Sequence, residues 1–325
     1  MPKKITSFSP IPPEALKKAL EDNSGMNDIE VINVHGLPEE EIIEKIPGTF
    51  IIYGDHTRGT PITRNIAMAA RGAKLVQQPS VGYDSIDVEA CKEAGIKVAN
   101  AAGANHIAVA EHTIMFALNL LKKLKELNEK THEGQWLQQV GHTDVFELYQ
   151  KTYGIIGLGQ IGKTTAERLV PFGVKTYYFD IKRPSENDEK RLNVSFLELD
   201  ELLKVSDIVS LHVPLDESTK NMIGERELGL MKETAILINV ARGGVVDEKA
   251  LAKALKENSI AGAGLDVFSV EPISSDNEIL GLENAILTPH TAGVTKEAIP
   301  RYGQITIANI IRVLKGQEPE NVVNE

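Results

Sequence analysis

The chain has 325 residues, of which 42% are hydrophobic, 25% charged and 5% aromatic, and these fractions are typical of a globular protein. Its length favours two domains of roughly 150 residues each. The formal net charge of −11 argues against a nucleic-acid-binding protein, which needs an excess of basic residues. The only cysteine, Cys91, excludes a disulfide framework within the chain and favours a reducing compartment.

The sequence indicates no membrane segment. Its longest apolar region, residues 107–121, is interrupted by Glu111, His112 and Asn119, and it is too short and too polar to cross a bilayer. The residues after Met1 lack the apolar stretch of a signal peptide. We therefore expect a cytoplasmic protein that binds neither membranes nor nucleic acid.

In the first hundred residues, short apolar runs alternate with amphipathic ones. The runs predict strands at Lys4–Phe8, Ile29–Val34, Thr49–Tyr53, Ala73–Gln77 and Ile96–Ala99. Helical patterns lie between them at Pro13–Glu21, Pro38–Lys45, Pro61–Ala70 and Ser85–Ala94. This alternation is typical of βαβ units and a parallel sheet.

A long helical pattern over Asn105–Lys130 and an irregular stretch over Gly134–Gln150 separate this region from a second alternation. There, near-continuous apolar runs predict buried strands at Tyr153–Gly157, Lys175–Phe179, Asp207–Leu211, Ala235–Val240, Ala261–Val267 and Ala285–Thr288. Helix starts are expected at Ser195–Glu198, a capping-box pattern, and at Asp247, with a last helix over Lys296–Leu314. The sequence therefore predicts an α/β protein with a doubly wound parallel sheet.

A glycine-rich turn follows the strand at Tyr153–Gly157. Gly157, Gly159 and Gly162 form a G-x-G-x-x-G pattern that opens a helix, and Asp180 lies 18 positions after Gly162. The first glycine allows a tight turn, the second lets the backbone approach a pyrophosphate, and the third lets the helix pack on the strand. Asp180 can accept hydrogen bonds from ribose hydroxyls and would repel a 2′-phosphate. The pattern therefore predicts a dinucleotide site that favours NAD over NADP, although Lys182 and Arg183 follow directly.

Three polar residues each follow a predicted strand in the last third of the chain: Arg242, Glu271 and His290. Ligands of an open parallel sheet bind at the carboxyl ends of its strands, so these residues can converge on one crevice. Arginine can bind a carboxylate through two parallel hydrogen bonds. Histidine can exchange a proton near neutral pH, and a neighbouring carboxylate favours its charged form. Together they provide the chemistry that hydride transfer to a 2-oxo acid needs.

The segments around these residues closely resemble the signatures of the D-isomer-specific 2-hydroxyacid dehydrogenase family. The resemblance covers nearly the whole chain, and it is carried by Thr152–Gly162, Ile238–Leu251, Gly264–Pro272, Leu287–Gly293, Val81–Asp87 and Ala110–His112.

The resemblance implies a role for each matching position. Arg242 would bind the substrate carboxylate, His290 would be the acid–base residue, and Glu271 would be its partner. The backbone of the loop at Val81 and Gly82 would also bind substrate. The implied NAD-binding positions, in addition to the three glycines and Asp180, are Gln160 and Ile161 at the pyrophosphate, His212, Val213 and Pro214 beside adenine, Thr219 near the phosphates, and Val240 and Asp266 at the nicotinamide carboxamide.

The resemblance also implies an architecture. A Rossmann-type NAD-binding domain, residues 102–292, would be inserted into a smaller flavodoxin-like substrate domain formed by residues 1–101 and completed by 293–325. The catalytic cleft would lie between the domains, and members of the family are usually homodimers through the cofactor domain.

The identity of the 2-oxo or D-2-hydroxy acid stays open at this point. Phosphoglycerate dehydrogenases resemble this chain but place arginines where Ile52–Asp55 and Leu75–Gly82 stand, and neither stretch contains a basic residue. This favours glyoxylate, hydroxypyruvate or pyruvate over 3-phosphoglycerate. A non-catalytic, NAD-sensing binding protein of the same fold is the second alternative. Formate dehydrogenases usually have glutamine where Glu271 stands, which argues against that activity.

Other kinds of site lack the necessary patterns. No two histidines share the i, i+4 spacing of a helical metal site, so no metal is expected. The sequence contains no G-x-S-x-G motif, so a serine hydrolase is not expected. Trp136, the only tryptophan, is interpreted as a packing residue.

Overall fold

A computed structural model describes residues 2–324 and divides the chain into two compact units. Unit 1 lies within Met1–Asn105 and Lys296–Glu325, and unit 2 is His106–Thr295. The chain thus crosses between the units after Asn105 and after Thr295. The domain borders that the resemblance implies, after residues 101 and 292, stay a prediction.

Unit 1 contains a five-stranded sheet in which every strand pairs in parallel with its neighbours. Its spatial order is β2-β1-β3-β4-β5, which is the order of flavodoxin-like sheets. The strands are β1 (Lys3–Ser7), β2 (Ile29–Asn33), β3 (Ile51–Tyr53), β4 (Leu75–Gln77) and β5 (Lys97–Ala99).

Helices cover both faces of this sheet, and two separate apolar clusters result. On one face, Leu16 and Leu20 of α1 pack with Ile310 and Leu314 of α12. The opposite cluster includes Ile42 of α2, together with residues of α3 and α4. The helices of unit 1 are α1 (Pro13–Ser24), α2 (Glu39–Lys45), α3 (Arg64–Ala69), α4 (Val88–Glu93) and α12 (Ala298–Leu314).

Unit 2 contains a seven-stranded parallel sheet of order β12-β11-β10-β9-β6-β7-β8. The order reverses between β6 and β9, so their carboxyl ends form the topological switch point of a Rossmann-type sheet. The strands are β6 (Thr152–Ile156), β7 (Lys175–Phe179), β8 (Val194–Phe196), β9 (Ile208–Leu211), β10 (Ile236–Asn239), β11 (Gly262–Leu265) and β12 (Ala285–Leu287).

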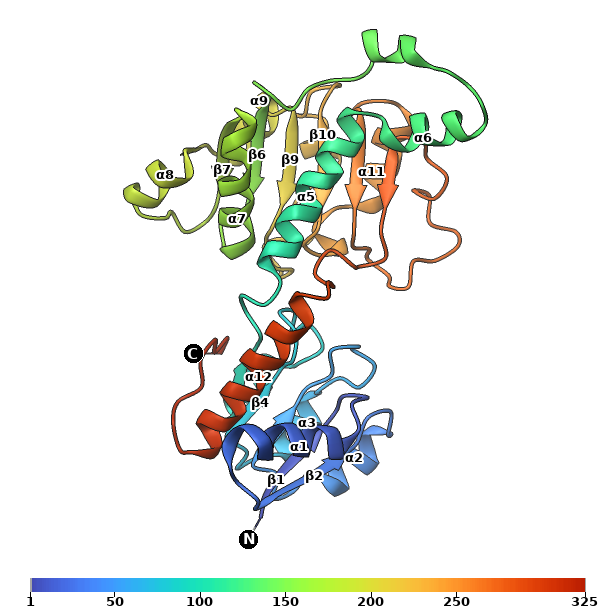
Figure 1. Ribbon diagram of the computed structural model, residues 1–325. Coiled ribbons are helices and arrows are strands. Elements are labelled where there is room, and N and C mark those ends of the chain that lie inside the picture. Colours follow the sequence, from blue (N-terminus) through green and yellow to red (C-terminus); the bar gives the residue numbers. More distant parts are fainter. Residues whose placement is uncertain (1, 325) are drawn as a thin grey trace. The chain divides into compact units, whose positions relative to one another are not determined.

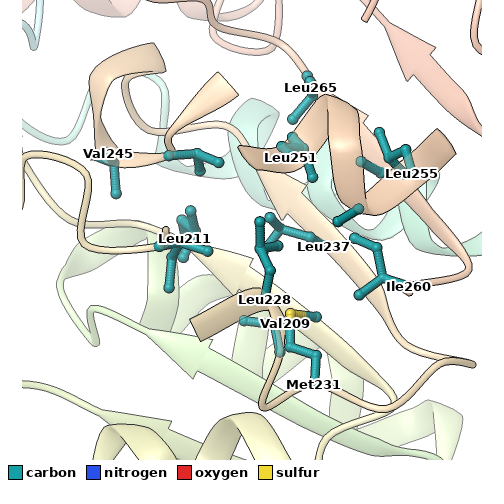
Figure 2. Packing of buried hydrophobic residues seen from close by; sticks show 14 of the residues in the cluster. Val209, Leu211, Leu228, Met231, Leu237, Val245, Leu251, Leu255, Ile260 and Leu265 are labelled. Carbon is teal, nitrogen blue, oxygen red and sulfur yellow. The ribbon is translucent and has the colours of Figure 1, made fainter. Parts of the chain in front are cut away.

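Both faces of the large sheet are also covered. Figure 1 shows α5 and α7 side by side on one face, where they contact each other. On the other face, Leu251 and Leu255 of α11 pack on Val209 and Leu237 of the sheet (Figure 2). The helices of unit 2 are α5 (His106–Leu121), α6 (Leu124–His132), α7 (Gln160–Leu169), α8 (Glu186–Leu192), α9 (Leu199–Val205), α10 (Glu225–Leu228) and α11 (Glu248–Lys256), with 3₁₀ turns η1 (Gln138–His142), η2 (Val170–Phe172) and η3 (Gly243–Val245).

The α/β fold class with parallel sheets predicted from the sequence is confirmed. The single long helix expected over Asn105–Lys130 is wrong, because it ends at Leu121 and restarts at Leu124, with Lys123 in the left-handed region at φ +48°. The break separates a mostly buried helix, α5, from α6, which has no buried residue among its described positions.

Two expected helix starts have different outcomes. The carboxylate of Asp247 caps α11 by accepting from the backbone N–H groups of Lys249 and Ala250, as predicted. The capping box at Ser195 is wrong, because Ser195 lies in β8 and α9 begins only at Leu199. Pairing of β8 with β7 decides this segment, and a local capping pattern cannot report that pairing. No helix within residues 2–324 combines the length and the apolar character needed to span a membrane.

Candidate active site

The glycine-rich turn lies at the switch point of the large sheet, directly after β6. Gly157 has φ +92°, and a Cβ added to it would come within 2.8 Å of the backbone carbonyl of His212, which follows β9. A Cβ on Gly162 would lie 2.1 Å from the carbonyl oxygen of Gly157. A Cβ on Gly159 would meet no protein atom within 4 Å. The fold itself therefore requires the first and third glycines, whereas the second leaves an open backbone that a ligand can approach.

Helix α7 begins directly after this open glycine. Gly159 is its N-cap residue, so no side chain satisfies the N–H groups of the first turn, which includes Gln160 and Ile161. Free N–H groups and the positive end of the helix dipole favour a phosphate at this position. The open approach at Gly159 and this uncapped helix start together fit the pyrophosphate of a dinucleotide.

Asp180 follows β7 and contacts the same turn. One carboxylate oxygen accepts a hydrogen bond from the N–H of Leu158 at 2.6 Å, and the other accepts from the N–H of Lys182 at 2.9 Å. The acidic side chain is therefore oriented beside the glycine-rich turn, where the ribose of a dinucleotide would lie. Arg183 is directed elsewhere, because its guanidinium carbon stacks over the ring of Phe196, 4.3 Å from the ring centroid.

The segment after β9 approaches the turn through its backbone. Its histidine side chain is half-buried, with Nε2 of His212 2.9 Å from the hydroxyl of Ser210. Burial lowers the pKa of His212 from 6.5 to about 3, so the imidazole is neutral. Val213 contributes a methyl group 2.9 Å from the position of a Cβ on Gly157, and Pro214 is exposed. Contact of His212, Val213 and Pro214 with adenine stays a prediction.

The burial of His212 predicts how stability depends on pH. Below pH 6.5 the unfolded chain binds a proton at this position, whereas the folded chain does so only near pH 3. Acidification between these values should therefore destabilise the fold by about 1.4 kcal/mol per pH unit through this group. We expect His212→Gln to flatten the decline of unfolding free energy with falling pH, measured by urea denaturation from pH 7 to 4.

The matched control is the exposed His142, and His142→Gln should keep the slope of the wild-type protein. An unchanged slope in His212→Gln would show that His212 is not the group responsible.

The structure also locates Thr219 and Val240, two other positions expected to bind NAD. The Thr219 hydroxyl donates to the carbonyl of Pro214 at 2.7 Å and accepts from the N–H of Asp216 at 2.9 Å. It therefore stabilises its own loop, and contact with phosphates stays a prediction. Val240 follows β10 and is buried.

The three candidate catalytic residues follow three adjacent parallel strands. Arg242 comes after β10, Glu271 after β11 and His290 after β12, and β11 pairs with both of the others. Their strands therefore place them at one edge of the sheet, the edge that also carries the glycine-rich turn.

His290 and Glu271 are in direct contact. Nδ1 of the imidazole lies 2.7 Å from a carboxylate oxygen of Glu271, and the other oxygen accepts from the N–H of Phe268 at 3.0 Å. The carboxylate is thus held by its own loop while it orients the imidazole ring. Because Nδ1 is occupied, Nε2 is the atom that can exchange a proton with a substrate.

Arg242 is connected to the same loop through its neighbour. A Cβ added to Gly243 would lie 1.9 Å from the carbonyl carbon of Phe268, so the turn after β10 packs tightly on the loop that carries Glu271. Asn239 holds this turn, since its side chain accepts from the N–H of Ala241 at 3.0 Å and donates to the carbonyl of Arg242 at 2.9 Å. The half-buried Arg242 side chain donates to the carbonyl of Ala241 at 2.7 Å.

Asp266 is almost fully buried, with 1% of its surface exposed. Its carboxylate accepts hydrogen bonds from the hydroxyl of Thr288 at 2.6 Å and from the N–H groups of Thr291 at 2.8 Å and Ala292 at 2.9 Å. A carboxylate offers about four acceptor sites, so little capacity remains for the nicotinamide contact expected from the resemblance. That contact stays a prediction.

In unit 1, the loop after β4 presents backbone donors. The carbonyl of Val81 accepts from the Asn100 side chain at 2.7 Å, and the carbonyl of Gly82 accepts from the hydroxyl of Ser80 at 2.8 Å. Within residues 2–324, the N–H groups of Val81 and Gly82 donate to no protein acceptor. The loop can therefore offer two oriented N–H groups to an anionic ligand.

Sequence reasoning gave no individual role to the polar residues that hold these elements, although His112 and Thr288 lie in segments that carry the family resemblance. Ser80, Asn100, Thr288 and His112 make their contacts through the tertiary fold, and single polar residues in a sequence carry no signal of such partners.

Comparisons with known proteins agree with this geometry. Residues 114–292 match the family described as D-isomer specific 2-hydroxyacid dehydrogenase, NAD binding domain. The chain belongs to this family.

Among its relatives, a glyoxylate reductase of Korarchaeum cryptofilum is 42% identical over 82% of this chain and 80% of the relative. A D-3-phosphoglycerate dehydrogenase of Methanocaldococcus jannaschii is 39% identical over 99% of this chain but only 59% of the relative. A solved structure of D-lactate dehydrogenase from Aquifex aeolicus, complexed with NAD and lactic acid, has a TM-score of 0.86 and 30% identity, covering 99% of each chain.

The family membership establishes the class of activity. The protein is an NAD-dependent D-2-hydroxyacid dehydrogenase, an oxidoreductase acting between 2-hydroxy and 2-oxo acids. The two-domain α/β fold with two parallel sheets is typical of this family.

Proposed function

We propose that this enzyme reduces a small, unphosphorylated 2-oxo acid of the glyoxylate, hydroxypyruvate or pyruvate type. The observation that carries the proposal is the 2.7 Å contact between His290 and Glu271 at the edge of the sheet that also holds Arg242 and the glycine-rich turn. Arg242 binds the substrate carboxylate through two parallel hydrogen bonds. The N–H groups of Val81 and Gly82 contribute to substrate binding.

Bound NADH supplies the hydride. His290 is protonated before the reaction and gives the proton on Nε2 to the substrate oxygen as negative charge develops there. Glu271 stabilises the imidazolium and fixes the ring. The glycine-rich turn, Gln160, Ile161 and Asp180 hold the dinucleotide, with the backbone around His212, Val213 and Pro214 beside its adenine.

The preference for an unphosphorylated substrate is supported by Gly54 and Gln78 in unit 1, which lie in the stretches where phosphoglycerate dehydrogenases carry arginines. A Cβ on Gly54 would lie only 2.1 Å from Oε1 of Gln78, so a long side chain at residue 54 would displace Gln78. The adjacent Asp55 is 2% exposed, and its carboxylate accepts from the N–H groups of Thr57 at 2.8 Å and Thr60 at 2.9 Å. Neither stretch supplies a positively charged side chain for a phosphate group.

The experiment that tests the proposal is a panel of 2-oxo acids with NADH at fixed enzyme concentration. We expect the highest kcat/KM for glyoxylate, hydroxypyruvate or pyruvate, and little oxidation of 3-phosphoglycerate with NAD. Efficient use of 3-phosphoglycerate would favour the phosphoglycerate alternative. An absence of turnover with bound NADH would favour the NAD-sensing alternative.

Cofactor preference gives a separate prediction. We expect kcat/KM for NADH to exceed that for NADPH by about 10²-fold, because placing a 2′-phosphate beside Asp180 costs several kcal/mol. Asp180→Asn removes the charge and keeps an acceptor for the N–H of Leu158, so it should narrow the gap mainly by improving NADPH. Asp180→Ala should narrow it further while weakening NADH. A wild-type preference for NADPH would contradict the role of Asp180.

A homodimer is proposed through unit 2. A groove of about 650 Å³ includes the apolar residues Met115, Leu124 and Phe172, and Trp136 is 82% exposed after α6. Such exposed apolar groups favour burial against a second copy of the chain. Light scattering should give twice the 35.5 kDa chain mass, with Met115→Glu producing monomers and the exposed Lys125→Glu remaining dimeric. A cytoplasmic location stays a prediction.

A further inference from the structure

The backbone at His290 adopts a conformation that side-chain-bearing residues rarely take. Its φ is +54°, in the left-handed region. A non-glycine residue in this region is strained by about 1–2 kcal/mol and persists only where neighbouring contacts hold it. The contacts that hold His290 therefore determine where its imidazole can be.

Asp266 supplies most of these contacts. The N–H of His290 donates to the backbone carbonyl of Asp266 at 2.8 Å, and the next two N–H groups, of Thr291 and Ala292, donate to its carboxylate. Thr288, two residues before His290, donates its hydroxyl proton to the same carboxylate at 2.6 Å. The turn is thus tied to Asp266 from both sides of His290.

A residue from a distant part of the sequence completes this arrangement. Nε2 of His112, on α5, lies 3.0 Å from the hydroxyl oxygen of Thr288. The only proton of that hydroxyl is given to Asp266, since a carboxylate can only accept. The hydroxyl must therefore accept from His112, which requires a proton on Nε2. Burial lowers the pKa of His112, against the opposing charge of Asp266 3.9 Å away, so the neutral Nε2–H tautomer is favoured.

Packing leaves the ring of His112 little freedom to turn away. It meets Phe116 edge to face with 4.6 Å between ring centroids, and its side chain is only 15% exposed. Phe116 is itself fully buried and packs on Gly264 of β11, where a Cβ would lie 2.7 Å from the ring. Helix α5 therefore holds the imidazole against the carboxyl ends of β11 and β12.

We propose that His112 and Thr288 are positioning residues for His290: the chain His112–Thr288–Asp266 fixes the strained turn that carries the acid–base imidazole. The proposal rests on the role proposed above for His290. Neither residue touches a reacting atom in this assignment. Loss of either should misplace His290 and lower kcat without changing which group exchanges the proton.

Steady-state kinetics of variants test this chain of hydrogen bonds. Thr288→Val keeps the side-chain shape without the hydroxyl, and His112→Phe keeps a ring without the donor. Each should lower kcat about tenfold, the effect of losing one buried hydrogen bond, and the double variant should lose no more than either single one. Thr288→Ser should restore kcat to within about twofold. The dissociation constant of NADH, measured by fluorescence, should stay unchanged. The pH dependence of kcat should also keep its wild-type shape.

The matched control is Thr113→Val on the same helix, because the buried Thr113 hydroxyl donates to the carbonyl of Val109 within α5 at 2.8 Å. This variant should show wild-type kcat even if its Tm falls. A Thr288→Val enzyme with the kcat of Thr113→Val, additive losses in the double variant, or no rescue by serine would each overturn the proposal.

A measurement that needs no activity separates this inference from the proposed function. The measurement is NMR of the protein labelled with ¹⁵N at its histidines. The imidazole signal that disappears in His112→Phe should show the neutral Nε2–H tautomer, and Thr288→Val should perturb that signal. The Nδ1–H tautomer would overturn the hydrogen-bond chain. Full activity in His290→Ala would instead overturn the acid–base assignment while leaving the tautomer result intact.

Discussion

Replacing Arg242 by lysine should lower kcat/KM for the 2-oxo acid by about 10²-fold, although the positive charge is kept. Hydrogen bonds to charged groups contribute about 1.5–3 kcal/mol each, and lysine cannot reproduce the two parallel bonds of a guanidinium to a carboxylate. The turn that positions Arg242 is held by Asn239 and packs through Gly243 on the loop of Glu271. The loss should therefore lie in substrate binding and orientation, and the dissociation constant of NADH should hardly change.

A graded series sharpens this test. Arg242→Ala should be impaired more than Arg242→Lys, and added guanidinium should partly restore the alanine variant. The matched control is Arg226→Lys, an exposed arginine that pairs with Asp200 and Glu227, which should keep normal kinetics. Near-normal reduction of 2-oxo acids by Arg242→Ala would show that another group binds the substrate carboxylate.

The parts of the site that the sequence predicted are those with local causes. Gly157 is required by its positive φ and by the carbonyl of His212, and Gly162 by the carbonyl of Gly157, so glycines at this spacing directly reflect the turn. Asp180 follows β7 by one residue, and strand ends are readable from apolar runs. The alternation of strands and helices likewise predicted an α/β fold with parallel strands, without knowledge of the strand order.

The parts that the sequence could not predict depend on tertiary pairing. The segment around Ser195 has a capping pattern, but its pairing with β7 makes it a strand. The break after Leu121 has neither glycine nor proline to signal it, and it occurs where burial of the helix ends. His112 and Thr288 are 176 positions apart and meet only because α5 packs on β11.

Replacing His290 by alanine should lower kcat by about 10²–10⁴-fold in both directions, which is the usual contribution of general acid–base catalysis. In reduction the imidazole must begin protonated, and in oxidation it must begin neutral. The rate of reduction should therefore fall as pH rises through the titration of the His290–Glu271 pair, and the rate of oxidation should rise over the same range. Because the two groups interact at 2.7 Å, this titration belongs to the pair.

Glu271→Gln tests whether the carboxylate favours the charged or the neutral form of the His290 imidazole. The amide keeps the shape of the side chain and can still accept from the N–H of Phe268, but it removes the negative charge beside the imidazole. The charged imidazole then loses its stabilising partner and releases its proton more readily, so the fall in reduction rate should move to lower pH. Exposed Glu278→Gln, which only removes an ion pair with Lys256, should leave the profile in place. The measurement is kcat/KM against pH in both directions, with NADH binding checked by fluorescence. A profile for Glu271→Gln that stays in place or moves to higher pH would refute the dyad, because a carboxylate in contact with the reacting imidazole cannot be removed without favouring its neutral form.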